Sequence, residues 1–135
     1  DLKPANIMLD GRGNARIMDF GVAGILNDLV AKGDIASGTP AYMAPEQIRG
    51  ADIDFRADLY AVGCTLFEML TGRLVFPEGE PMFHHMYTPP PDPVALAPTT
   101  PPALSRIILA CLEKDQEART KSAAVLLEQL RAIAV

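Results

Sequence analysis

Asn6 and Asp19, an amide and a carboxylate near the start of the chain, are separated by a sequence typical of a β-hairpin. Short apolar runs at 7–9 and 15–18 flank residues 10–14, whose glycines and Asx residues suit a tight reversal. Such a hairpin would bring Asn6 and Asp19 face to face, because directly opposed residues have Cβ atoms about 4.5 to 5.5 Å apart. Mg²⁺ typically takes one or two such protein oxygens and completes its shell with phosphate and water. The pattern therefore predicts a site for a hard divalent cation.

The expected pairing of the two strands gives this cation site an apolar neighbour. The predicted register pairs Ile7 with Met18, Met8 with Ile17 and Leu9 with Arg16. Because side chains alternate between the two faces of a strand, Met8 and Ile17 would share the face of the cation site. An apolar floor beside a metal that binds phosphates indicates a nucleotide base above it.

Two more reactive side chains, Asp1 and Lys3, precede Asn6 in a loop that Pro4 stiffens. A carboxylate at Asp1 could take the proton of a hydroxyl group, and the ammonium of Lys3 could offset charge on a phosphoryl group in transfer. Taken alone, a D-x-x-x-x-N or a D-F-G sequence is most often a turn or a helix cap. Their occurrence together favours the chemical interpretation.

Composition and charge limit the classes of protein to which the chain can belong. Its 135 residues amount to about one domain, and 49% hydrophobic against 21% charged residues is typical of a globular fold. The net charge of −5 offers no basic surface to nucleic acid, and no apolar stretch is long enough to span a bilayer. Cys64 and Cys111 are interpreted as small core residues in a reducing compartment, and His84 and His85 as solvated surface residues.

The remaining sequence predicts a mainly α-helical domain. Residues 22–56 contain glycines and prolines with little periodicity, which indicates a long irregular segment with short helices at most. A helix at 57–71 is apolar on nearly every side, belongs in the middle of the domain and stops at Gly72. The other helices are expected at 82–87, from an N-cap at Thr100 to Lys114, and at 122–133.

Several of these residues fall in motifs that resemble those of the eukaryotic-type protein kinases. The matching segments are 1–6 with the catalytic loop, 19–21 with the metal-binding triplet, 38–46 with the end of the activation segment, 58–63 with the start of the central helix, and Arg119 with a late arginine. The matches keep the family's order and spacing over nearly the whole chain. The resemblance implies a protein-kinase-like C-terminal lobe, which is a helical bundle with a small β-hairpin at its N-terminus.

The same resemblance implies ATP and Mg²⁺ as cofactors and gives each motif residue a role. Asp1 would be the catalytic base, and Lys3 would bind and stabilise the transferring phosphate. Asn6 and Asp19 would hold Mg²⁺, and Met8 would lie under the adenine of ATP.

Further residues acquire structural or regulatory roles. By the resemblance, Glu46 and Arg119 would form a buried bidentate ion pair that locks the activation segment to the helical core. Asp58 lies at the head of the central helix, where a carboxylate can cap it, and the resemblance adds hydrogen bonds to the catalytic-loop backbone. Thr39 would touch the aspartate and the lysine of the catalytic loop, and Ser37 is a candidate for activating phosphorylation.

The type of kinase is indicated by a few positions. Lys3 and Thr39 are similar to the residues of serine/threonine kinases and unlike those of tyrosine kinases, so the implied substrate is a protein with a serine or threonine hydroxyl. The Pro-Glu-Gln ending of the activation segment and the proline-rich stretch before Pro101 are most similar to bacterial members. Small-molecule kinases with a related D-x-x-x-x-N loop lack the segment 38–46.

The family's Gly-rich loop, strand lysine, helix glutamate and adenine-binding hinge would all lie before Asp1. We therefore expect residues 1–135 to be the C-terminal lobe of a longer cytoplasmic kinase, with the absent N-lobe of the same kinase as a partner and a membrane anchor outside this segment left open. The isolated lobe is expected to be inactive, since half of the nucleotide site would be absent. The alternative is a non-catalytic, kinase-like module that scaffolds other proteins.

Overall fold

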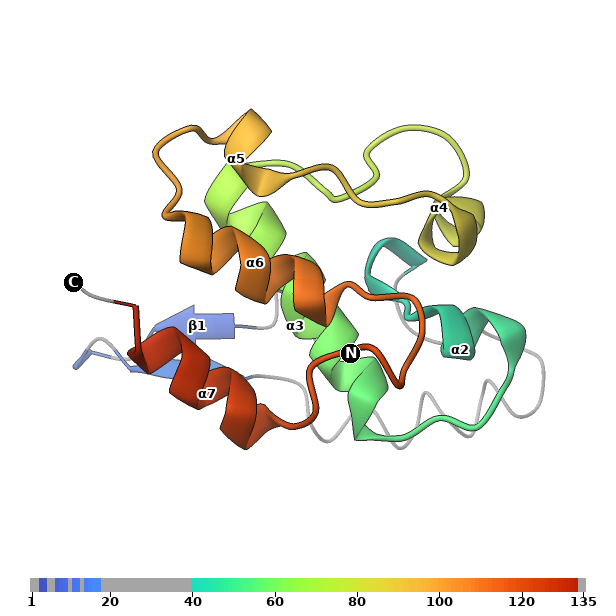
Figure 1. Ribbon diagram of the computed structural model, residues 1–135, viewed down its shortest axis with the longest axis horizontal. Helices are drawn as coiled ribbons and strands as arrows, with labels where there is room; N and C mark the ends of the chain where they lie inside the picture. The colour runs from blue at the N-terminus through green and yellow to red at the C-terminus, as the bar shows by residue number, and fades with distance from the viewer. Residues whose placement is uncertain (1–2, 5–6, 10, 13, 18–39, 134–135) are drawn as a thin grey trace.

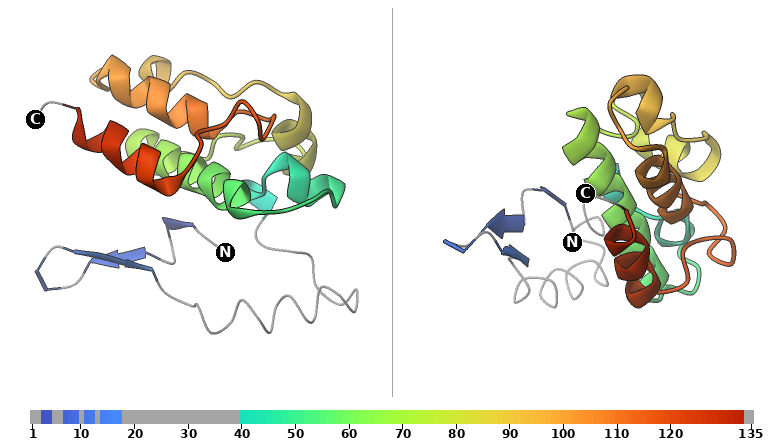
Figure 2. Two further views of the ribbon diagram at one scale, coloured as in Figure 1. Left: turned by 60° about the horizontal axis from the view of Figure 1, so that its bottom comes forward. Right: turned by 60° about the vertical axis from the view of Figure 1, so that its left-hand side comes forward.

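The computed structural model describes residues 3–4, 7–9, 11–12, 14–17 and 40–133. The elements in chain order are β1 (Ile7–Leu9), β2 (Ala15–Ile17), the 3-10 helix η2 (Pro40–Tyr42), α2 (Pro45–Arg49), α3 (Phe55–Thr71), α4 (Pro81–Tyr87), α5 (Pro93–Leu96), α6 (Pro102–Cys111) and α7 (Ala123–Arg131) (Figure 1). The predicted class, a mainly helical domain with a small N-terminal hairpin, is confirmed. In both views of Figure 2 the hairpin lies on the opposite side of α3 from α6.

The hairpin is antiparallel, as expected, but its register differs from the prediction by one residue. The observed pairs are Ile7 with Ile17, Met8 with Arg16 and Leu9 with Ala15. Pairing Leu9 with Ala15 leaves 10–14 as the connection, a loop of the four-to-five-residue class common in hairpins, whereas the predicted register needed a longer one. Met8 is therefore opposed to Arg16 rather than to Ile17, and the predicted facing of Asn6 and Asp19 loses its support. Both of those residues lie outside the described part of the chain.

Helix α3 is the centre of the fold, and it begins and ends at capping residues. It starts earlier than predicted because Asp54, not Asp58, is its N-cap: the Asp54 carboxylate accepts a hydrogen bond of 2.9 Å from the Arg56 amide. The predicted stop at Gly72 is confirmed, since this glycine has a φ of 76°, in the left-handed region that favours glycine.

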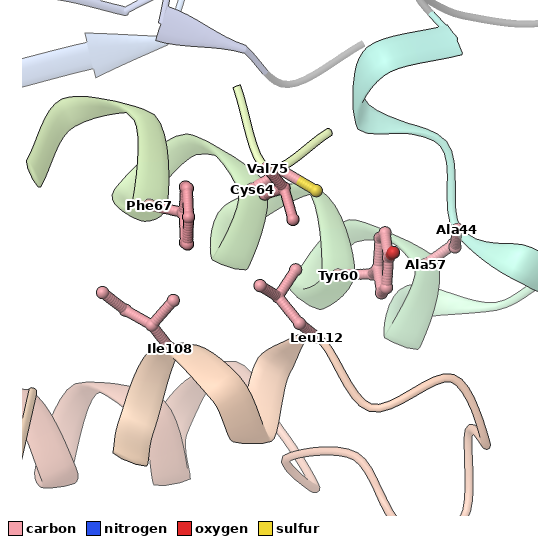
Figure 3. Packing of buried hydrophobic residues seen from close by; sticks show 8 residues of the cluster. All are labelled: Ala44, Ala57, Tyr60, Cys64, Phe67, Val75, Ile108 and Leu112. Carbon is pink, nitrogen blue, oxygen red and sulfur yellow. The ribbon is translucent and has the colours of Figure 1, made fainter. Parts of the chain in front are cut away.

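Two hydrophobic clusters pack on α3. The first joins α3 to α6 and to neighbouring segments through Ala44, Ala57, Tyr60, Cys64, Phe67, Val75, Ile108 and Leu112 (Figure 3). The second joins the other side of the α3–α6 pair to α7 through Leu59, Ile107, Cys111 and Leu126. Both cysteines are free and buried, as predicted for core residues. The two clusters therefore hold α3, α6 and α7 together, and Tyr42 of η2 packs against the first.

The later helices differ from the prediction mainly at their ends. Thr100 does not cap α6, because its hydroxyl donates back to the Ala97 carbonyl; the N-cap position is occupied by Pro101. Helix α6 also ends at Cys111, before the predicted Lys114. Helix α7 starts as expected, with the Ser122 hydroxyl accepting a hydrogen bond from the Val125 amide.

The proline-rich stretch is more helical than expected. It contains α4, which begins one residue before the predicted start, and also the short α5, which the sequence did not predict. None of the helices in the described ranges is long and apolar enough to cross a membrane.

Candidate active site

The segment that resembles the end of a kinase activation segment is described from Pro40 onward. It forms one turn of 3-10 helix, η2, and then enters α2 through Ala44, whose amide donates to the Gln47 side chain at 2.8 Å. Proline at the first turn of α2 costs no hydrogen bond, since that amide would have no partner in the helix. The segment 40–46 is thus a compact double turn, and three of its groups are tied to the helical core.

The first tie is the ion pair predicted between Glu46 and Arg119. The guanidinium donates to both carboxylate oxygens, at 2.7 and 3.0 Å, and the two side chains are fully buried. The other three N–H groups of Arg119 donate to the carbonyls of Arg56, Glu113 and Lys114. All five donors of the guanidinium are therefore satisfied, which is the condition under which a buried charge is tolerated.

The ionisation of Glu46 agrees with this geometry. Burial alone would raise the pKa of its carboxyl, but the hydrogen bonds from Arg119, together with a backbone hydrogen bond, outweigh burial and hold the pKa below its usual value. The carboxylate is therefore charged at neutral pH, and the pair fixes α2 to the loop that carries Arg119.

The second tie was not predicted and joins η2 to α3. The Tyr42 hydroxyl donates a hydrogen bond to the carboxylate of Glu68. Burial, followed by this contact with a negative group, raises the pKa of Tyr42 well above its usual range, so the phenol keeps its proton. The sequence shows Glu68 as a charged residue in the mostly apolar second half of α3, but it does not indicate which group this carboxylate contacts.

The third tie involves His85, which corrects the prediction that both adjacent histidines are solvated. His85 is fully buried on α4, and its ring lies between the Tyr60 hydroxyl at 2.7 Å and the Ala41 carbonyl at 2.9 Å. Burial lowers the pKa of His85 to about 4, so the ring is neutral at physiological pH. His84 is half-buried, stacks on Phe76 and contacts the Thr88 hydroxyl.

The remaining predicted residues are described only in part. Lys3 is half-buried, Met8 is described by its backbone alone, and Asp58 lies exposed in the first turn of α3. The residues outside the described ranges are Asp1, Asn6, Asp19, Ser37 and Thr39. Within the described ranges, no group of three or more His, Cys, Asp or Glu side chains is arranged to hold a metal.

Comparison with known families identifies the class. The sequence model of the protein kinase domain family matches residues 1–130, nearly the whole chain. This match, together with the helical fold and the anchored Ala44–Pro45–Glu46 segment, shows that the chain belongs to the protein kinase family.

Among the curated proteins that the chain resembles are several bacterial serine/threonine-protein kinases. The chain is 40% identical over 131 residues to the DNA damage-responsive serine/threonine-protein kinase RqkA of Deinococcus radiodurans, covering 93% of this chain and 20% of that protein. It is 42% identical over 133 residues to Pkn1 of Myxococcus xanthus, covering 92% and 19%, and 38% identical over 134 residues to the probable kinase PknB of Corynebacterium glutamicum, covering 91% and 21%. The chain thus spans about a fifth of the length of these relatives.

Proposed function

We propose that this chain is the catalytic-loop half of a serine/threonine protein kinase, which transfers the γ-phosphoryl group of ATP to a serine or threonine hydroxyl of a protein. The observation that carries the proposal is the kinase match over residues 1–130, because that range includes Asp1, Lys3, Asn6 and Asp19 with no position of the two motifs changed. The names of the relatives support the choice of serine and threonine as acceptors.

The motif residues divide the chemistry among them. Asp1 would accept the proton of the substrate hydroxyl as the hydroxyl oxygen bonds to the γ-phosphorus of ATP, while the bond from that phosphorus to the β–γ bridging oxygen breaks and ADP leaves; Lys3 would offset negative charge on the transferring group. Asn6 and Asp19 supply an amide oxygen and a carboxylate, a donor set that suits Mg²⁺, and Met8 supplies an apolar surface under the adenine. When bound, Mg²⁺ neutralises charge on the phosphates of ATP.

In this proposal, the described segment 40–46 contributes to the protein-substrate side of the site. Thr39, which in the proposal contacts Asp1 and Lys3, directly precedes Pro40 and therefore the segment tied by the contacts of Ala41, Tyr42 and Glu46. The ties of this segment to α3 and α4 support the proposed role of Thr39 beside it.

The proposal also gives roles to Asp58, which would act on the catalytic loop, and to Ser37 of the activation segment. Asp58, in the first turn of α3, would hydrogen-bond the backbone of the catalytic loop. Ser37 lies in the activation segment and would accept a regulatory phosphate. Both roles rest on the resemblance of their positions to those of the family.

The proposal further assigns residues 1–135 to the C-terminal lobe of the kinase domain, with an N-terminal lobe of the same polypeptide as its partner on the cytoplasmic side of the cell. The small share of each relative that the chain covers supports this assignment. The N-lobe would complete the nucleotide site, so the lobe alone is expected to be inactive.

Two substitutions in the complete kinase test the assigned roles. Asp1→Asn should lower the rate of phosphoryl transfer about 10² to 10⁴-fold while leaving ATP affinity unchanged, because it removes only the base. Asp19→Asn should weaken binding of ATP in the presence of Mg²⁺. The matched control is Asp52→Asn, since the Asp52 side chain is exposed and only its carbonyl is used, by Gln116.

The alternative function makes a different prediction for the same proteins. A non-catalytic scaffolding module would show no transfer of ³²P to protein in any variant, and Asp1→Asn would match the wild type. Loss of ATP affinity to the same extent in Asp1→Asn and Asp19→Asn would contradict the separate roles of base and metal ligand.

A further inference from the structure

His85 is the point at which three elements meet. It projects from α4 and contacts the Tyr60 hydroxyl of α3 through Nδ1 and the Ala41 carbonyl of η2 through Nε2. Helix α4 lies beside the segment of η2 and α2 (Figure 1), although some forty residues separate His85 from Ala41 in the sequence. The contact is therefore a tertiary link between the Pro40–Tyr42 turn and the helical core.

The hydrogen bonds fix the protonation state of the ring. A carbonyl oxygen only accepts, so Nε2 must carry the proton that is donated to Ala41. In a neutral imidazole Nδ1 is then an acceptor, and the Tyr60 hydroxyl donates to it. Burial favours this neutral form by lowering the pKa of His85, and the positive charge of Lys114, which donates to the His85 carbonyl at 2.8 Å, acts in the same direction.

The contact of His85 with Ala41 is one of two ties that hold the ends of the segment 41–46 to the helical core. The Arg119 guanidinium lies 5.1 Å from the centroid of the Tyr60 ring and also holds Glu46. Ala41 and Glu46, five positions apart, are thus tied to the neighbouring side chains Tyr60 and Arg119, one of them through His85. A segment held at both ends cannot shift along α3 without breaking one of the two ties.

We propose that His85 is a positioning residue for protein phosphorylation: its Nε2–H donates to the Ala41 carbonyl and holds the Pro40–Tyr42 turn in register with the catalytic loop. This inference rests on the proposed kinase function, since it needs Thr39, next to Pro40, to contact Asp1 and Lys3. His85 touches no reacting atom. Its loss should therefore impair the use of protein substrate and leave the use of ATP unchanged.

Steady-state kinetics on the complete kinase test the role. In His85→Leu the Ala41 carbonyl loses its donor, and kcat/KM for the protein substrate should fall about tenfold, while KM for ATP stays at the wild-type value. In His85→Gln the side-chain amide still offers an N–H, and kcat/KM should recover to within about threefold of wild type. The matched control is His84→Leu, which alters the neighbouring histidine on the same helix without touching η2, and it should behave as wild type.

Two measurements read the contact independently of catalysis. A ¹⁵N spectrum of the imidazole should show the Nε2–H tautomer for His85 at neutral pH, and amide hydrogen exchange over residues 43–48 should be about tenfold faster in His85→Leu but not in His85→Gln. If the wild type transfers no phosphate, the kinase proposal fails while these two measurements still decide the contact. If His85→Leu does not fold, the imidazole spectrum of the wild type and the hydrogen exchange of His85→Gln still test the contact.

The inference is overturned by any of three results. The first is an Nδ1–H tautomer, because that ring could not donate to Ala41 through Nε2. The second is a folded His85→Leu kinase with wild-type kcat/KM and exchange. The third is a His85→Gln variant that is impaired as strongly as His85→Leu, which would show that the donated hydrogen bond is not what matters.

Discussion

Arg119 uses two of its five N–H groups to hold Glu46, a residue 73 positions earlier in the chain, and both side chains are sealed from solvent. The other three donors hold the Arg56 carbonyl in the first turn of α3 and the Glu113 and Lys114 carbonyls just after α6. The Arg119 side chain therefore connects α2, the start of α3 and the loop after α6. Among the described residues one carboxylate matches its charge, so removing either partner would leave the other buried without this ion pair.

The Glu46→Gln substitution should destabilise the protein by about 3 to 5 kcal/mol, because it leaves the Arg119 charge uncompensated in the interior. Urea unfolding measures the change. The control is Glu117→Gln, whose carboxylate pairs with Arg56 but is 80% exposed, and which should cost about 1 kcal/mol or less. Equal costs for the two substitutions would mean that burial does not set the strength of the pair.

Gly63 marks the closest approach of α3 to α6. A Cβ at this position would lie 2.8 Å from the Cys111 Cβ and 3.1 Å from two atoms of Leu112. The Cys111 Cβ sits directly on the backbone and cannot swing away, so Gly63→Ala should force the helices apart and cost about 1 to 3 kcal/mol. Gly11→Ala is the control, since a Cβ there meets nothing within 4 Å. A Gly63→Ala midpoint in urea equal to that of Gly11→Ala would contradict the close packing.

Periodicity, which is local, predicted the existence of α3, α4, α6 and α7, whereas the expected caps at Asp58 and Thr100 were wrong and α5 was not predicted. The apolar pattern of α3, its stop at Gly72 and the start of α7 near Ser122 follow from residues in or next to each helix. The predicted register of the hairpin was wrong because the pairing of two strands is not determined by the local pattern within each strand. An alternating strand pattern does not say which residues face each other, and one residue in the loop shifts every pair.

The site was predictable where a motif named both partners and not elsewhere. Glu46 and Arg119 were paired from the resemblance, and the structure places them in contact. The hydrogen bonds of Tyr42 and His85 depend on how α3, α4 and η2 pack, and no sequence spacing relates these residues to their partners. His85 was expected at the surface because two adjacent histidines on a helix cannot readily share a metal, and a solvated position was weighed against a ligand site without considering burial.

Stability should depend on pH through His85. Burial lowers its pKa to about 4 from an ordinary value of 6.5, and the nearby positive charge of Lys114 acts in the same direction. Between these two values the unfolded chain binds a proton that the folded protein does not, so stability falls as the pH falls. From pH 7 to pH 4.5 the wild type should lose about 2 kcal/mol more than His85→Leu, measured by urea unfolding at each pH. Parallel pH profiles of the two proteins would show that His85 titrates normally when folded.

The hydrogen bond from Tyr42 to Glu68 should appear as a coupling energy in a double-mutant cycle. Because the acceptor is a carboxylate in a partly buried place, Tyr42→Phe and Glu68→Gln should each destabilise the protein, and the double variant should cost about 1 to 2 kcal/mol less than their sum. Urea unfolding of the four proteins gives the cycle. Tyr87→Phe, at a tyrosine that is 64% exposed, is the matched control and should change nothing. Strict additivity of Tyr42→Phe and Glu68→Gln would show that the contact does not tie η2 to α3.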